Sequence, residues 1–168
     1  MRQTSFSDMH CDLARALDVV GDWWTPLILR DLYLGLTRFE EIAENLEISR
    51  NLLSVRLASL VEEGVVERVR YSEHPPRDRY ELTESGADLV PVLMALTAWG
   101  DRWRRPSRGV PMKFHHLTCG HVFTPTVACS LCRGPLRAAD VEVRPGPGGR
   151  AGRGTRLIAK KLRERAAR

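Results

Sequence analysis

Cysteine is scarce in this 168-residue chain, which has four such residues. They are Cys11, Cys119, Cys129 and Cys132. So few thiols do not make a disulfide scaffold at this length, and we expect a metal or redox role for them. Long apolar runs are missing too, because no stretch approaches the roughly 20 apolar residues that span a bilayer. The N-terminal MRQTSFSDMH also lacks the charged-then-apolar pattern of a secretory signal, which predicts a cytoplasmic protein with no membrane segment.

A net excess of positive charge is absent from most of the chain. The formal net charge is +5, but residues 144–168 hold nine Lys or Arg against Glu164 alone, which leaves residues 1–143 at −3. A general attraction to nucleic acid is therefore excluded for the body, and any such role depends on where particular arginines lie. A serine–histidine–acid set, a phosphate loop and an open metal site are also lacking, so we do not expect an enzyme.

Apolar spacing predicts two helices in the first 35 residues. The segment 12–20 has apolar residues at helical intervals. Thr25 followed by Pro26 indicates an N-cap and first helical position of a nearly all-apolar, buried helix that ends at Gly35.

Two further helices are predicted with a short turn between them. Thr37 and Glu40 have the capping-box spacing and begin a helix that ends at Leu46. Ser49 caps the next helix and Gly64 ends it. Two helices joined by so short a turn are typical of a helix-turn-helix.

A basic hairpin and a long helix are expected next. Val- and Tyr-rich strands flank SEHPPRD, whose Pro75 and Pro76 should forbid regular pairing at the tip. Thr83 caps a helix that continues to Trp103 and is ended by Pro106. The predicted fold is mainly α with a small β-hairpin wing (α+β), a winged helix-turn-helix.

The helix that Ser49 begins has an outward face suited to a DNA groove. Leu53, Leu57 and Leu60 should face the core. The opposite stripe is short or hydrogen-bonding, as close approach to base edges requires. The residues expected to contact DNA, from this helix and the basic residues around it, are Arg38, Ser49, Arg50, Asn51, Ser54, Val55, Arg56, Arg68, Arg70, Arg77 and Arg79. An ordinary solvated helix is the competing interpretation.

The segment from Cys11 to Trp103 resembles the HxlR-type branch of the MarR-like winged-helix transcriptional regulators. The matching stretches are ALDVVGDWWTPLILRDLYLG, RFEEIAENLEISRNLLSVRLASLVEEGVVERVRY, HPPRDRYELTESG and LVPVLMALTAWGDRW. The resemblance implies a bacterial DNA-binding regulator, most often a repressor. It also implies a homodimer in which the first and last domain helices form the interface and the two recognition helices read a pseudo-palindromic operator. A winged-helix module that docks on transcription machinery through a zinc hairpin is the alternative.

A second region, 113–143, carries the remaining cysteines. Cys119, His121, Cys129 and Cys132 form a C-x-H pair and a C-x2-C pair that suit one structural zinc in a small zinc-ribbon-like hairpin. His115 and His116 compete for the histidine position, and an unmetallated hairpin with incidental thiols is the other interpretation.

Three smaller features have two interpretations each. Cys11 precedes a helix and is either a redox sensor or a small core residue. The basic tail, 144–168, either adds salt-sensitive affinity for DNA or only solubilises the terminus. Trp23, Trp24, Trp99 and Trp103 either line a cavity for a small-molecule effector or pack the core and dimer interface. The DNA-binding and dimerisation domain is expected over residues 11–104.

Overall fold

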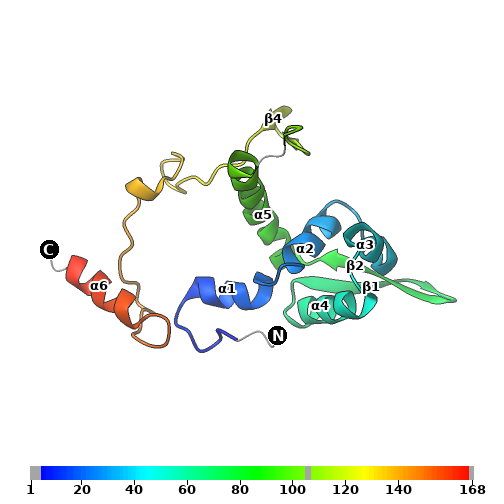
Figure 1. Ribbon diagram of the computed structural model, residues 1–168, viewed down its shortest axis with the longest axis horizontal. Helices are drawn as coiled ribbons and strands as arrows, with labels where there is room; N and C mark the ends of the chain where they lie inside the picture. Colours follow the sequence, from blue (N-terminus) through cyan, green and yellow to red (C-terminus); the bar gives the residue numbers. More distant parts are fainter. Residues whose placement is uncertain (1–4, 105–106, 167–168) are drawn as a thin grey trace. The chain divides into compact units, whose positions relative to one another are not determined.

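The computed structural model describes residues 5–104 and 107–166 (Figure 1). It forms two compact units, Met1–Pro26 with Ala138–Arg168 and Leu27–Arg137. No helix in the described ranges is long and apolar enough to cross a membrane. Pro106, the expected end of the long helix, lies outside the described residues.

The larger unit holds the winged helix-turn-helix, so the predicted α+β fold is confirmed. Its elements are α2 (Thr25–Tyr33, which begins in the other unit), α3 (Phe39–Leu46), α4 (Arg50–Glu62), β1 (Val66–Glu73), β2 (Pro76–Leu82), α5 (Glu84–Trp103), β3 (Phe114–His116) and β4 (His121–Phe123). The smaller unit contains α1 (Asp12–Val20), a 3-10 turn (Ala138–Asp140) and α6 (Arg156–Ala166).

One apolar core holds α2, α3, α4 and the start of β1 together. Its fully or nearly fully buried side chains are Ile28, Leu29, Leu32, Ile42, Ile48, Leu53, Leu57, Leu60, Val65 and Val66. The predicted inward face of α4 is confirmed, because Leu53, Leu57 and Leu60 are all buried. Burying each such side chain contributes about 1.5–3 kcal/mol, which fixes the helix orientation.

The start of α2 differs from the prediction. Thr25 is the first helical residue, and the Asp22 carboxylate accepts hydrogen bonds from the backbone N–H groups of Trp24 (2.6 Å) and Thr25 (3.1 Å). An ionised acceptor at a helix N-terminus satisfies unpaired donors better than a hydroxyl does. The expected complete burial of α2 is also wrong, because Leu27 and Tyr33 are exposed.

The start of α3 is shifted by one residue from the expected Thr37–Glu40 capping box. Arg38 is the N-cap, and its backbone N–H donates to the Glu41 carboxylate at 2.9 Å. The carbonyl oxygen of Thr37 instead accepts the N–H of Tyr80 in β2 at 2.8 Å. Strand-like pairing of Thr37 therefore moves the helix start by one position.

The two strands of the wing pair over more residues than predicted. The antiparallel ladder of β1 and β2 runs from Val66↔Leu82 to Glu73↔Pro76, with an irregularity between Arg70 and Ser72. The expectation that the prolines forbid regular pairing is wrong, because Pro76 occupies the first position of β2, where proline is tolerated.

The helix α5 starts at a tight junction with β1. Thr83 Oγ1 donates to the Gly64 carbonyl oxygen at 2.7 Å and accepts the N–H of Gly86 at 3.2 Å. A Cβ on Gly86 would lie 2.2 Å from the Val65 carbonyl oxygen, so only glycine fits. Further along, α5 exposes an apolar stripe of Val92, Leu96, Trp99 and Trp103.

In the smaller unit, the first part of the basic tail, residues 144–155, contains a hydrogen-bonded turn. Gly152 N–H donates to Thr155 Oγ1 at 3.1 Å, and Thr155 Oγ1 donates to the Arg150 carbonyl oxygen at 2.9 Å, which forms a turn before α6. Arg153 also pairs with Asp8 at 2.9 Å. The tail therefore attaches to the N-terminal segment through this ion pair.

Candidate DNA-binding surface

The turn between α3 and α4 places the start of α4 at the surface. Glu47 adopts a left-handed conformation (φ +50°) and ends α3, and the buried Ile48 anchors the turn. Ser49 Oγ then accepts the N–H of Leu52 at 3.3 Å, as the predicted N-cap should. The backbone thus presents the first turn of α4 outward, in the position from which helix-turn-helix proteins contact bases.

The outward stripe of α4 lies where the sequence predicts it. Asn51, Ser54, Val55 and Ala58 are all exposed, whereas Arg56 beside them is half-buried. Asparagine and serine can hydrogen-bond base edges, and the small Ala58 allows close approach of the helix. Their contacts with DNA remain predictions.

Arg50 is held by an acid that the sequence analysis did not single out. Both terminal nitrogens of its guanidinium bond the Glu40 carboxylate, one at 2.6 Å, and the guanidinium carbon lies 5.2 Å from the centre of the Phe39 ring. The hydrogen bond from Arg50 lowers the pKa of Glu40 and raises the pKa of Arg50. Arg50 is therefore positioned against the start of α3 before any DNA is present.

The wing arginines are also paired with acids. Arg70 Nε and Arg68 Nε donate to separate oxygens of Asp78 at 2.6 and 2.7 Å. Both hydrogen bonds lower the pKa of Asp78, and the one from Arg70 has the larger effect. Arg79, whose side chain lies on the opposite face of the ladder, bonds Glu81. The charge of the predicted arginine cluster is therefore partly neutralised within the wing.

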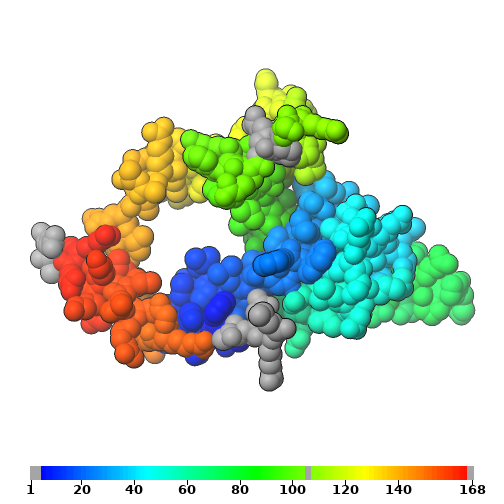
Figure 2. Space-filling view, in the orientation of Figure 1, coloured from blue at the N-terminus to red at the C-terminus, as the bar shows by residue number. Residues whose placement is uncertain are grey.

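Arg38, which is the N-cap of α3, and Arg77 of the wing differ from the acid-paired arginines. The Arg38 guanidinium lies 5.3 Å from the centre of the Tyr71 ring. Within the described ranges Arg77 is exposed and has no ion-pair partner, so it is the wing arginine most available to phosphate. Figure 2 shows the wing, in green, projecting beyond the cyan surface of α3 and α4.

The sequence analysis also missed a buried polar link behind this surface. Asp31 is 1% exposed and accepts hydrogen bonds from Arg30 at 2.6 Å and from Asn45 Nδ2 at 2.7 Å. It ties α2 to the end of α3. A charged residue in an otherwise apolar helix was the available signal, since such groups are seldom buried without partners.

The predicted zinc ligands are not gathered in one place. In the described part of the chain no group of three or more His, Cys, Asp or Glu side chains is arranged to hold a metal ion. Cys119 instead lies 3.2 Å from Nδ1 of His116, the histidine that competed with His121. Cys129 accepts hydrogen bonds from the backbone of Cys132 and Leu131 and from the Cys132 thiol, which lower the pKa of the Cys129 thiol.

Cys11 occupies the N-cap position of α1 and is half-buried, with no side-chain capping hydrogen bond. In the same unit, Trp23 is 91% exposed and Trp24 is half-buried. Neither tryptophan lines the cavity described next.

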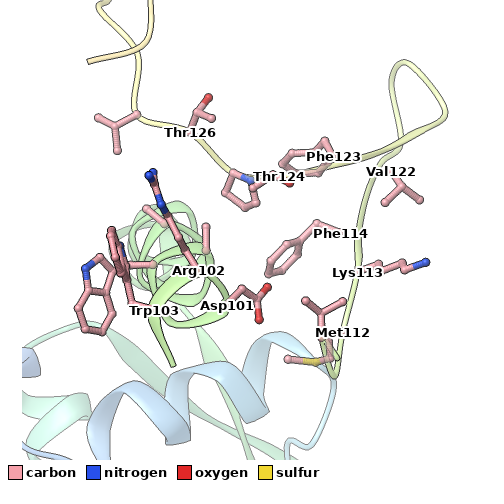
Figure 3. Close-up of a pocket in the computed structure, with 16 residues that line it drawn as sticks. Asp101, Arg102, Trp103, Met112, Lys113, Phe114, Val122, Phe123, Thr124 and Thr126 are labelled. Atoms are coloured by element: carbon pink, nitrogen blue, oxygen red, sulfur yellow. The ribbon is translucent and has the colours of Figure 1, made fainter. Parts of the chain in front are cut away.

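A groove of about 880 Å³ lies between the end of α5 and the hairpin of β3 and β4 (Figure 3). Trp99 and Trp103 contribute to one wall, as one of the two interpretations requires. Phe114 and Phe123, whose ring centres are 6.0 Å apart, line the opposite side. We call it the aromatic groove after these four rings, although charged side chains such as Arg102 and Lys113 also line it.

The fold and this surface define a winged helix-turn-helix DNA-binding protein of the transcriptional-regulator class. More narrowly, the chain belongs to the HxlR-like helix-turn-helix family, whose model matches residues 19–108. It is 44% identical to an HTH-type transcriptional regulator of Mycobacterium tuberculosis over an alignment of 139 residues. This alignment covers 83% of this chain and 88% of that relative.

Solved structures agree with this assignment. PA1607, described as a candidate transcription factor, is 35% identical and matches 85% of this chain and 100% of its own with a TM-score of 0.75. The reduced form of the redox regulator HypR is 30% identical and matches 56% of this chain and 94% of its own with a TM-score of 0.53. The names of these relatives denote regulators and not enzymes.

Proposed function

We propose that this transcriptional regulator is a cytoplasmic repressor that binds a pseudo-palindromic operator as a homodimer. The observation that carries the proposal is the start of α4, which is capped, outward-facing and lined by small or hydrogen-bonding side chains. Binding over a promoter would exclude RNA polymerase. We assign base contacts to Arg50 and Asn51 and phosphate contacts to Arg77 and Arg79.

The exposed apolar stripe of α5 supports the dimer. Val92, Leu96, Trp99 and Trp103 recur on one side of the helix and are each more than half exposed. Leu13 of α1 is also 68% exposed. Large apolar side chains exposed in a continuous row mark a protein interface. Leu96→Glu should give a monomer in analytical ultracentrifugation and weaken operator binding.

Fluorescence anisotropy on DNA from the region upstream of the protein's own gene tests the proposal. Wild type should bind in the presence of scrambled competitor, and Arg50→Ala should lose about 10-fold to 100-fold in affinity, as expected for a good base contact. Arg108→Ala, an exposed arginine outside the helix-turn-helix, is the matched control. Equal loss in both variants would contradict base reading by α4.

The basic tail is tested in the same assay. Replacing Lys160 and Lys161 of α6 by Gln removes charge but keeps good helix formers. If the tail adds phosphate contacts, the variant should show a smaller dependence of affinity on salt, by about one unit of slope for each lost contact. An unchanged slope would leave the tail as a solubilising terminus.

We place a redox response of the regulator at Cys11. The half-burial of this thiol and its position before α1 support the assignment, as does the similarity to HypR, which is named a redox regulator. Diamide should change DNA affinity in wild type and not in Cys11→Ser. The same response in both proteins would remove Cys11 as the sensor.

A small-molecule effector is assigned to the aromatic groove of Figure 3. An apolar, aromatic compound bound there should change the fluorescence of Trp99 or Trp103. Phe123→Ala should weaken that response without altering the fold of the helix-turn-helix.

The second candidate function, a docking module for transcription machinery, rests on two exposed leucines. Leu117 and Leu131 are 89% and 90% exposed at the turns of the cysteine region. If docking were the main activity, sequence-specific DNA binding would survive replacement of Arg50 and Asn51 by Ala, whereas partner binding would be lost in Leu117→Ser.

A further inference from the structure

Two loops in the cysteine region have the same local backbone conformation. The first loop, residues 116–120, joins β3 to β4, and the N–H of Gly120 donates to the carbonyl oxygen of His116 at 2.8 Å. Gly120 is left-handed, with φ +71°. This turn brings the side chains of its first and fourth residues together, with His116 Nδ1 3.2 Å from Cys119 Sγ.

The second loop, residues 129–133, repeats this arrangement. The N–H of Arg133 donates to the carbonyl oxygen of Cys129 at 2.9 Å, and Arg133 is left-handed with φ +61°. An isolated bridge between Ala128 and Pro135 closes the base of the loop, as the β3–β4 pairing closes the first. The first and fourth residues are again potential metal ligands, here Cys129 and Cys132.

The second loop holds strain that packing does not explain. Arg133 has a positive φ although it is not glycine, which is an uncommon and unfavourable backbone state. No residue in 107–137 is buried, so no core requires that conformation. The turn does place backbone N–H groups of Leu131 and Cys132 on the sulfur of Cys129, where they would stabilise a thiolate ligand.

We propose that a single Zn²⁺ joins the two loops, with each loop supplying two ligands. The four ligands are His116, Cys119, Cys129 and Cys132. Three thiolates and one imidazole match the tetrahedral preference of zinc, and binding would release the protons of the thiols. The described part of the chain does not bring three of these donors together, so the metal must draw the loops toward each other.

His121 does not fit this site, although its spacing from Cys119 first suggested it. It lies in β4, paired with His116 across the strand ladder and beyond the left-handed Gly120. Only His116 stands in the same place in its loop as Cys129 does in the second. The repetition of the loop therefore selects the histidine that sequence spacing left open.

The segment between the two hairpins can allow this closure. Residues 124–127 belong to no helix or strand, and they line the aromatic groove together with Phe123. Zinc binding would therefore fix one wall of that groove as well as the two loops.

Metal analysis of the full-length protein, purified under reducing conditions, tests the site. We expect one zinc per chain in wild type. His116→Ala should lose most of this zinc. The matched control is His121→Ala, two residues after Cys119, which should keep it. Retention in His116→Ala with loss in His121→Ala would overturn the assignment, and so would wild type that binds no zinc when zinc is supplied.

Cobalt substitution separates a ligand role from a folding defect. Wild type loaded with Co²⁺ should show the visible absorption of a tetrahedral site and the near-ultraviolet band of thiolate ligands. His116→Cys should retain the metal and increase the thiolate band, because a fourth sulfur replaces the imidazole. If His116→Cys loses Co²⁺ while its helix-turn-helix still binds DNA, His116 is not a ligand.

Discussion

The helix-turn-helix and the cysteine region of the same compact unit are stabilised in different ways. Between residues 27 and 104 the elements meet over buried side chains such as Ile28, Ile42 and Leu57, each 0% exposed. In residues 107–137 no side chain is buried. The first region can hold its shape by apolar burial, whereas the second has no such core, which agrees with the zinc site proposed for it. Small regions without a core commonly depend on a metal or another cross-link.

The largest expected effect concerns the apolar core of the helix-turn-helix. Leu57→Ala opens a cavity in the core and should lower the free energy of unfolding by about 2–5 kcal/mol. Leu131→Ala removes the same atoms from a side chain that is 90% exposed and should change it little. Urea unfolding of both variants is the measurement. Similar losses in the two proteins would mean that the cysteine region is packed as the core is.

The junction of α5 with β1 should show the next largest effect. In Gly86→Ala the new Cβ would lie 2.2 Å from the Val65 carbonyl oxygen, so the backbone must move, at a cost of about 1–3 kcal/mol. Gly100→Ala lies in the same helix with nothing within 4 Å and should instead stabilise by about 1 kcal/mol. Thermal unfolding should therefore move in opposite directions for the two variants, and a shared direction would contradict the close contact.

Zinc removal tests whether the proposed metal stabilises the cysteine region. A chelator should speed amide hydrogen exchange in residues 114–137 and leave the exchange of α4 unchanged, because only the cysteine region depends on the metal. Mass-spectrometric hydrogen exchange, with and without chelator, measures both regions in one experiment. Equal acceleration in both would show that the metal supports the whole unit.

The smallest effect concerns the ion pair of Glu40 with Arg50. The hydrogen bond from Arg50 holds the pKa of Glu40 in the folded protein below its usual value of 4.5, so the pair's stabilisation is present above that value and is lost as pH falls through the lower folded pKa. Both side chains are more than half exposed, so the change should be slight. Urea titrations should show a weaker acid dependence in Glu40→Gln than in wild type.

Much of the helix-turn-helix could be predicted because local and tertiary signals agree there. Ser49 and Gly64 mark the ends of α4, and its leucine spacing identifies the buried face. Thr37 was misassigned because its carbonyl oxygen pairs with Tyr80, 43 positions later in the chain, and this long-range contact overrides a good local cap.

The site was less predictable than the fold. Glu40 and Asp78 neutralise arginines that sequence analysis treated as free, and both contacts join residues at least eight positions apart. The strand register that places Asp78 opposite Arg70 was hidden by the prolines at the wing tip. Spacing alone also could not choose between His116 and His121, because the choice depends on the shape of the turn.

The Glu40 carboxylate competes with DNA for the Arg50 guanidinium. Before Arg50 can contact a base or phosphate, it must exchange the carboxylate for the new acceptor. In the proposed complex this exchange is needed only where Arg50 contacts DNA, because on other sequences the guanidinium can stay on Glu40. The proposed base contact would therefore be favourable only where the new acceptor offsets the loss of the Glu40 carboxylate, so the ion pair would penalise sequences that offer Arg50 a poor acceptor.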